Sequence, residues 1–87
     1  MPDAFIWYHA DEKLESKLME WIDEAEEHAG VRGSLLVRKE NEQTTFMETY
    51  SDVSSATITR IEALAAKKPL FKNLIRRCES FQRVDKL

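Results

Sequence analysis

Three side chains of this sequence could together move a proton, because they combine a tunable base with a hydroxyl donor: His9, Glu48 and Tyr50. His9 ends the apolar run 4–9, and the other two lie near the end of the run 44–50. We expect these runs to be parallel neighbouring strands, which would bring the three side chains to one end of a sheet. A His–Glu pair beside a tyrosine hydroxyl supplies what proton transfer at a carbonyl compound needs. The alternative is that His9 is hydrogen-bonded to its surroundings at a strand end and Glu48 lies at a wet edge.

Two tryptophans are candidates for binding a ligand. Trp7 and Trp21 could line a pocket between a sheet and its helices, although both positions also suit a hydrophobic core. The two histidines and the single cysteine share no metal-ligand spacing. Neither a glycine-rich phosphate loop nor a dinucleotide fingerprint occurs. We therefore expect no metal ion and no cofactor.

A run of basic residues is a candidate for binding anions. The segment 67–77 holds five basic residues and no acidic one. Within it, Lys72, Arg76 and Arg77 are candidate ligands of a phosphate, an RNA backbone or a small anion. The alternative is a solvated basic face that meets the acidic helix around 23–27. The net charge of −3 disfavours nucleic acid as a partner.

Length and composition limit the kind of protein that carries these residues. The 87 residues suffice for one globular domain, 1–87, and one cysteine cannot form an intramolecular disulfide. No apolar run approaches the roughly 18–20 residues of a membrane span. The first residues, MPDAF, lack the basic and apolar regions of a secretory signal. We expect a soluble, cytoplasmic protein that does not enter a membrane.

The hydrophobic pattern divides the chain into alternating strands and helices. It predicts strands at 4–9, 31–39 and 44–50, helices at 11–29 and 54–68, a short helix at 70–75 and a weak last strand at 79–85. The first helix begins at Asp11, an expected N-cap, and ends at Gly30, an expected C-cap. The polar loop 40–43 predicts a hairpin between the second and third strands. The order is β-α-β-β-α-β, which is typical of a ferredoxin-like α+β fold, whose four-stranded antiparallel sheet has the strand order 4-1-3-2.

This topology leaves one face of the sheet without helices, because two right-handed crossovers put both helices on the same side. Alternation along the first strand puts Phe5 and Trp7 on one face and Ile6 and Tyr8 on the other, so both faces are apolar. Leaving one such set in water would forgo several kcal/mol of burial, at about 25 cal/mol per Å². We therefore expect a homodimer that packs sheet against sheet. The alternative is a monomer with a few exposed aromatic side chains.

Several segments resemble those of one protein family. The strand AFIWYH, the helix that ends in Ala-Gly before a strand, and the segment TTFMETYSDVSSA are similar to the dimeric α+β barrel superfamily, which includes antibiotic-biosynthesis monooxygenase-like and stress-responsive barrel-like proteins. The resemblance implies a dimer and, in some relatives, cyclisation or cofactor-free oxidation. The chain is also similar to a small group of bacterial proteins known only as a domain of unknown function, which implies no activity.

Two functions are consistent with these features, and a third is weaker. The first is a small homodimeric structural or ligand-binding domain with no catalysis of its own. The second is a cofactor-independent monooxygenase- or cyclase-like enzyme that acts on a small aromatic or polyketide-like compound, with His9 as base and Tyr50 as donor. The third is an anion- or RNA-binding module that uses the basic segment 67–77.

Overall fold

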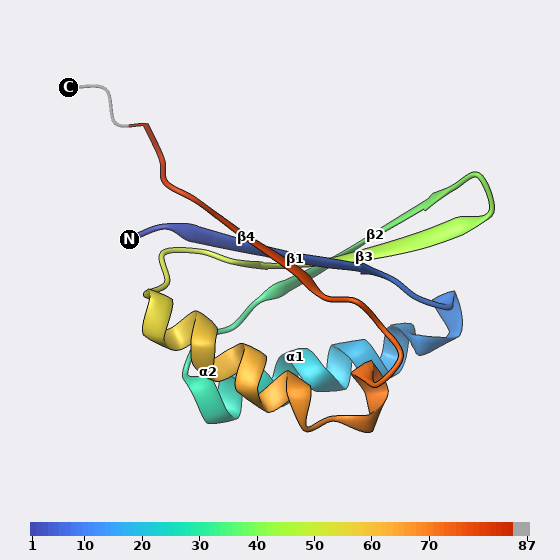
Figure 1. Ribbon diagram of the computed structural model, residues 1–87, viewed down its shortest axis with the longest axis horizontal. Helices are drawn as coiled ribbons and strands as arrows, with labels where there is room; N and C mark the ends of the chain where they lie inside the picture. The colour runs from blue at the N-terminus through green and yellow to red at the C-terminus, as the bar shows by residue number, and fades with distance from the viewer. Residues whose placement is uncertain (85–87) are drawn as a thin grey trace.

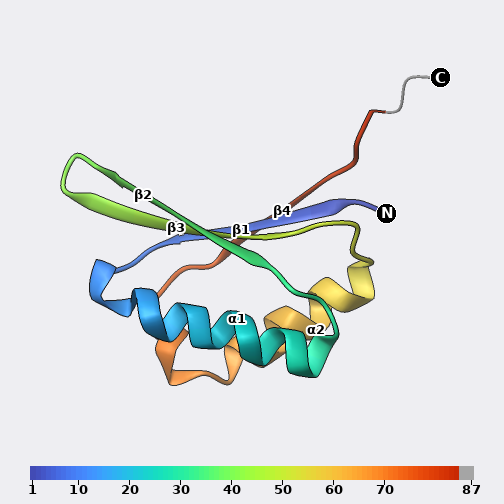
Figure 2. The ribbon, with the colours of Figure 1, turned by 180° about the vertical axis from the view of Figure 1, so that it is seen from behind.

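Both long helices of the chain cover the same face of a four-stranded sheet (Figure 1 and Figure 2). The structure is a computed structural model, and it describes residues 1–84. The elements in chain order are β1 (Asp3–His9), η1 (Glu12–Leu14), α1 (Glu15–Ala29), β2 (Ser34–Glu40), β3 (Gln43–Tyr50), α2 (Ser55–Ala66), η2 (Pro69–Phe71) and β4 (Arg77–Phe81). None of the helices in residues 1–84 is long and apolar enough to cross a membrane.

The sheet has the strand order β2-β3-β1-β4, and all neighbouring strands are antiparallel. The expected strand order is thereby confirmed. The expectation that the third strand runs parallel to the first is wrong, because Ala4 pairs with Tyr50 and His9 pairs with Thr45. The physical reason is the hairpin: the helical crossover returns β2 in the direction of β1, and the turn then reverses β3 before it pairs with β1.

The turn between β2 and β3 consists of two residues, Asn41 and Glu42, which both have a left-handed backbone (φ 51° and 62°). Two left-handed residues match the twist of the flanking strands, so the hairpin is tighter than the predicted four-residue loop. Strand β2 begins at Ser34, later than predicted, and Gly33 directly before it lies against the ring of Tyr50.

The helix caps follow the predicted residues with one shift. Asp11 accepts a hydrogen bond from the backbone N–H of Lys13 and caps the short turn η1, and α1 begins only at Glu15. Gly30 ends α1 in a left-handed conformation (φ 77°), as expected of a C-cap. Ser54 caps α2 by accepting from the N–H of Thr57.

The C-terminal elements are shorter than predicted or lie elsewhere. The short helix η2 has three residues, and the last strand spans 77–81, whereas the prediction was 79–85. Asp85, the predicted end of that strand, lies outside the described residues.

The core lies between the sheet and the two helices. On the helix-covered face, the buried strand residues are Ala4, Ile6 and Tyr8 of β1 and Phe46, Glu48 and Tyr50 of β3. They pack against Leu18, Trp21, Ile22 and Ala25 of α1 and Ile61 and Ala65 of α2, with Phe71 of η2. No element of residues 1–84 covers the opposite side, which we call the open face (Figure 2). The sequence therefore correctly predicted one uncovered aromatic face, and the structure adds that it is the face of Phe5 and Trp7.

Candidate functional site

The most polar feature of the interior surrounds Glu48, which is fully buried on the helix-covered face. The hydroxyl of Tyr8 donates to its Oε2 at 2.6 Å, and the hydroxyl of Tyr50 donates to its Oε1 at 2.7 Å. Alternation along β1 and β3 puts all three side chains on the same side of the sheet, and antiparallel pairing brings them together. A carboxylate is stable at such a position only when it is paired and hydrogen-bonded.

Arg76 supplies the countercharge. Its Nη1 donates to Oε2 of Glu48 at 2.7 Å, and its Nη2 donates to Oε1 at 3.2 Å. The same guanidinium also donates to Glu62 of α2, at 2.6 Å from Nη2 to Oε2. It lies over the ring of Phe71, 4.3 Å from the ring centre. We call Tyr8, Glu48, Tyr50, Glu62 and Arg76 the Glu48 cluster.

The protonation of the Glu48 cluster is fixed by its surroundings. Burial raises the pKa of both Tyr8 and Tyr50, and the negative charge of Glu48 raises these pKa values further. Burial disfavours the charged form of Arg76, but its hydrogen bonds to Glu48 and Glu62 outweigh that cost and raise the pKa of the guanidinium. Both hydroxyls keep their protons and the guanidinium keeps its charge near neutral pH, so the cluster behaves as a structural ion pair.

His9 lies away from this cluster, on the open face at the end of β1. Its Nδ1 is 2.9 Å from the hydroxyl of Thr45, and its ring meets Trp7 edge to face at 5.6 Å between centroids. Because His9 pairs with Thr45, five residues before Tyr50, about 17 Å of strand separates it from Tyr50. His9 and Tyr50 also point to opposite faces, so the structure does not bring the predicted proton-transfer group together. Glu48 and Tyr50 do meet, with Tyr8 and Arg76 in place of His9.

The two tryptophans lie in different surroundings. Trp21 belongs to the core, 1% exposed, with its ring edge-on to Phe71 at 5.2 Å. Its indole N–H donates to no group of residues 1–84. Trp7 lies on the open face, where its indole N–H donates to Glu79 at 2.9 Å and the guanidinium of Arg77 lies 4.7 Å from its ring. Of the two, only Trp7 lines an open surface.

Two of the three predicted anion ligands, Lys72 and Arg76, line the same hollow of about 580 Å³ near the end of α2, whereas Arg77 lies over Trp7 on the open face. The guanidinium of Arg76 is already held by two carboxylates, Glu48 and Glu62, and Lys72 is exposed. Lys68 of the same segment forms an ion pair of 2.7 Å with Glu24 of α1. That contact agrees with the alternative, a basic segment that meets the acidic helix.

Sequence reasoning missed Tyr8 and Arg76 as partners of Glu48, and Glu62 as the second partner of Arg76. The available signal was the alternation that puts Glu48 on the same face of its strand as Phe46 and Tyr50. A buried carboxylate requires a cation, but the sequence does not say which of its thirteen basic residues supplies it. That cation is Arg76, which lies 28 positions further along the chain.

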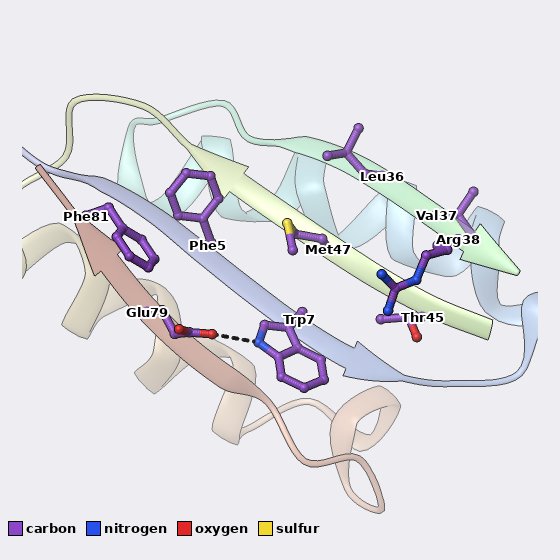
Figure 3. A pocket seen from close by; sticks show the side chains of 9 residues that line it. All are labelled: Phe5, Trp7, Leu36, Val37, Arg38, Thr45, Met47, Glu79 and Phe81. Carbon is purple, nitrogen blue, oxygen red and sulfur yellow. Dashed lines mark hydrogen bonds between the residues drawn. The ribbon is translucent and has the colours of Figure 1, made fainter. Parts of the chain in front are cut away.

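The open face is hollowed into a groove of about 790 Å³, which we call the open-face groove (Figure 3). Nine side chains from all four strands line it: Phe5, Trp7, Leu36, Val37, Arg38, Thr45, Met47, Glu79 and Phe81. Its centre is apolar, and its charged residues, Arg38 and Glu79, come from the edge strands β2 and β4. Within residues 1–84, no group of three or more His, Cys, Asp or Glu side chains could hold a metal ion.

No protein-family model matches the chain, and no curated protein matches it. Several solved structures do. The de novo designed protein Foldit4 has a TM-score of 0.75 at 19% identity, covering 95% of this chain and 98% of the design. A putative PII-like signaling protein from Thermus thermophilus has a TM-score of 0.61 at 17% identity, covering 93% and 88%. SnoaB of Streptomyces nogalater, a cofactor-independent oxygenase, has a TM-score of 0.60 at 17% identity, covering 99% and 96%.

The chain has a ferredoxin-like α+β fold. The resemblance to antibiotic-biosynthesis monooxygenase-like proteins is confirmed at the level of the fold, which this chain shares with them and with the PII-like protein. At 14–19% identity the similarity extends to the fold alone. Proteins as different as an oxygenase, a putative PII-like signaling protein and a de novo design share this fold. The fold by itself does not specify a function, which depends on the side chains on the two faces of the sheet.

Proposed function

We propose that this ferredoxin-like chain is the subunit of a homodimeric α+β barrel, in which two copies pack open face against open face. Its role is structural or ligand-enclosing, and it has no catalytic activity of its own. The observation that carries the proposal is the open-face groove, because helices cover the other face of the sheet and no element of residues 1–84 covers this one.

The composition of the open face supports a protein partner. Phe5, Trp7 and Met47 in its centre are half-buried, and Leu36 and Phe81 near its edges are 53% and 59% exposed. An apolar centre within a polar rim is the usual anatomy of a protein interface. Each of these half-covered side chains would contribute on the order of 1 kcal/mol on full burial.

The geometry of the sheet supports self-association. Two sheets that pack face to face lie about 10 Å apart, with interdigitating side chains. A twofold interface uses the same patch on both copies, so an apolar patch complements itself. A small domain also benefits from such a partner, because its own core is thin.

The contacts of the candidate residues give less support to catalysis. The side chains of His9 and Tyr50 lie on opposite faces, so they cannot act on one substrate atom. The carboxylate of Glu48 is occupied by two hydroxyls and a guanidinium, and the space beside it is filled by packed rings such as Phe71. A general base needs free access to the proton that it removes.

Sedimentation equilibrium of the 10.2 kDa chain tests the proposal. We expect a species of twice that mass at micromolar concentration. Leu36→Glu puts a charge into the open face and should yield a monomer with an unchanged circular dichroism spectrum. Met19→Glu is the matched control, because Met19 is an exposed apolar residue (41%) on α1, and it should leave the dimer intact. A wild-type monomer at concentrations up to about 100 µM would refute the proposal.

A further inference from the structure

Strand β4 forms one wall of the open-face groove. Its alternate side chains are Arg77, Glu79 and Phe81, which we call the β4 wall. Arg77 lies over the ring of Trp7, and Glu79 accepts the indole hydrogen bond of Trp7. Phe81 meets Phe5 edge to face at 5.7 Å. Figure 3 shows Glu79 and Phe81 beside the aromatic side chains of β1. The shape of the proposed interface therefore depends on where β4 lies.

Besides the side-chain contacts of the β4 wall, β4 is held by its pairing with β1 and, just beyond its end, by the ion pair of Arg83 with Asp3 at 3.3 Å. All five of its residues are exposed, and its backbone pairs with β1 alone because it is an edge strand. Exposed backbone hydrogen bonds of this kind open easily. The residue directly before β4 is Arg76, whose side chain is 9% exposed and bound to Glu48 and Glu62 on the helix-covered side.

We propose that Arg76 is the positioning residue of the β4 wall. Side chains of consecutive residues in extended backbone point to opposite faces. Because the side chain of Arg76 is held on the helix-covered side directly before β4, the side chains at 77, 79 and 81 point to the open face. The guanidinium binds both β3 and α2, which fixes the distance of β4 from the helices and its register against β1. A residue with no contact in the groove thereby determines one of its walls. The inference rests on the proposed function, since this wall is part of the dimer interface.

The indole N–H signals of ¹⁵N-labelled protein test this coupling directly. The chain has two tryptophans, so two signals are expected, and Trp7→Phe assigns them. The Trp7 signal reports the hydrogen bond to Glu79 of the β4 wall, and the Trp21 signal reports the core. Both are recorded in the monomeric Leu36→Glu background, because Trp7 lines the proposed interface and dimerisation would itself shift its signal.

Arg76→Met removes both ion pairs while keeping a long side chain. We expect the Trp7 signal to move to the position that Glu79→Ala produces, because alanine removes the acceptor of the indole N–H, and we expect the dimer dissociation constant to rise about tenfold. Arg76→Lys keeps the positive charge but cannot form the two parallel hydrogen bonds of a guanidinium. We therefore expect a smaller shift of the Trp7 signal and a smaller rise in the dissociation constant than for Arg76→Met. Ile58→Ala on α2 is the matched control, because it destabilises the core without touching β4. It should leave the Trp7 signal unmoved and the dissociation constant within about twofold.

The outcomes separate the two proposals. If Arg76→Met lowers stability as Ile58→Ala does but leaves the Trp7 signal in place, Arg76 is only structural and the inference is wrong. If Arg76→Met does not fold, Glu62→Gln and Arg76→Lys must each move the Trp7 signal in the expected direction, and failure of either to do so overturns the inference. A wild-type monomer whose Trp7 signal depends on Arg76 refutes the proposed dimer and leaves the positioning role standing.

Discussion

Glu48 and Arg76 form a forked ion pair in the interior, with one donor–acceptor distance of 2.7 Å and a second of 3.2 Å. The carboxylate is fully buried and the guanidinium side chain is 9% exposed, so water hardly solvates either charge. The pair joins the centre of the sheet to the segment that leads into β4. It also makes a carboxylate stable at a position that alternation would otherwise reserve for an apolar residue.

Removing the carboxylate should cost far more than breaking an exposed pair. We expect Glu48→Ala to lower the free energy of unfolding by about 3–5 kcal/mol, because it leaves Arg76 partly unpaired and two tyrosine hydroxyls without their acceptor. The control is Glu24→Ala, which breaks the one-third exposed ion pair with Lys68 and should cost at most about 1 kcal/mol. Urea unfolding of both variants measures the difference, and equal losses would contradict the burial argument.

Alkaline pH should unfold the protein through its two tyrosines. Burial, followed by the charge of Glu48, raises the pKa of Tyr8 and Tyr50 in the folded state above the ordinary value of 10.0. Above about pH 10 the unfolded chain releases these protons and the folded chain keeps them, so stability is complete below that pH and falls as the pH rises. Each tyrosine contributes a slope of about 1.4 kcal/mol per pH unit.

The measurement for that prediction is urea unfolding between pH 9 and about 11.5. Tyr50→Phe removes one titrating group and should halve the slope. An unchanged slope in this variant would mean that other groups carry the alkaline transition.

We expect any side chain at position 33 to destabilise the protein, because Gly33 packs directly against the ring of Tyr50. A Cβ atom at position 33 would lie 2.5 Å from Cε1 of that ring, which is buried and held by Glu48. We expect Gly33→Ala to cost about 2–3 kcal/mol, since the backbone or the ring must move. Gly30→Ala is the comparison: it meets no atom within 4 Å and pays only for its left-handed backbone, about 1 kcal/mol. Thermal unfolding ranks the two, and a smaller loss at position 33 would contradict the contact.

The hairpin turn should accept a stabilising substitution. Glu42 adopts a left-handed backbone (φ 62°) at the second turn position, where glycine is preferred. We expect Glu42→Gly to raise the free energy of unfolding by about 0.5 kcal/mol, because the relief of backbone strain exceeds the entropy cost of glycine. Glu40→Gly, two residues earlier in β2, should be destabilising instead. Unfolding of both in denaturant checks the opposite signs.

Much of this fold follows from local patterns. The spacing of Leu18, Trp21, Ile22 and Ala25 specifies one buried stripe of a helix, and Gly30 ends that helix because glycine adopts a left-handed backbone without strain. Period-two alternation places the side chains of each strand on two faces. Element order then suffices for the strand order and for a sheet with helices on one side, since short crossovers have a fixed handedness.

The candidate site needed the tertiary structure, because it depends on strand register and on distant pairing. Alternation within single strands correctly grouped Phe46, Glu48 and Tyr50, and the predicted crossover and hairpin together imply that β3 runs against β1. The antiparallel direction puts His9 and Tyr50 at opposite ends of the strand pair, and the register, in which His9 pairs with Thr45, puts them on opposite faces.

The partner of Glu48 was likewise beyond local reasoning. Arg76 looked like one of five basic residues on a solvated segment, and only packing of that segment against the sheet and α2 buries it between two carboxylates. The sequence by itself determined which side chains of each strand share a face and that one aromatic face lacks helices, because these follow from the local geometry of strands and short connections. It left open which of the two faces the helices cover. The tertiary structure decided which inward groups meet, because their pairing depends on contacts between residues far apart in the chain.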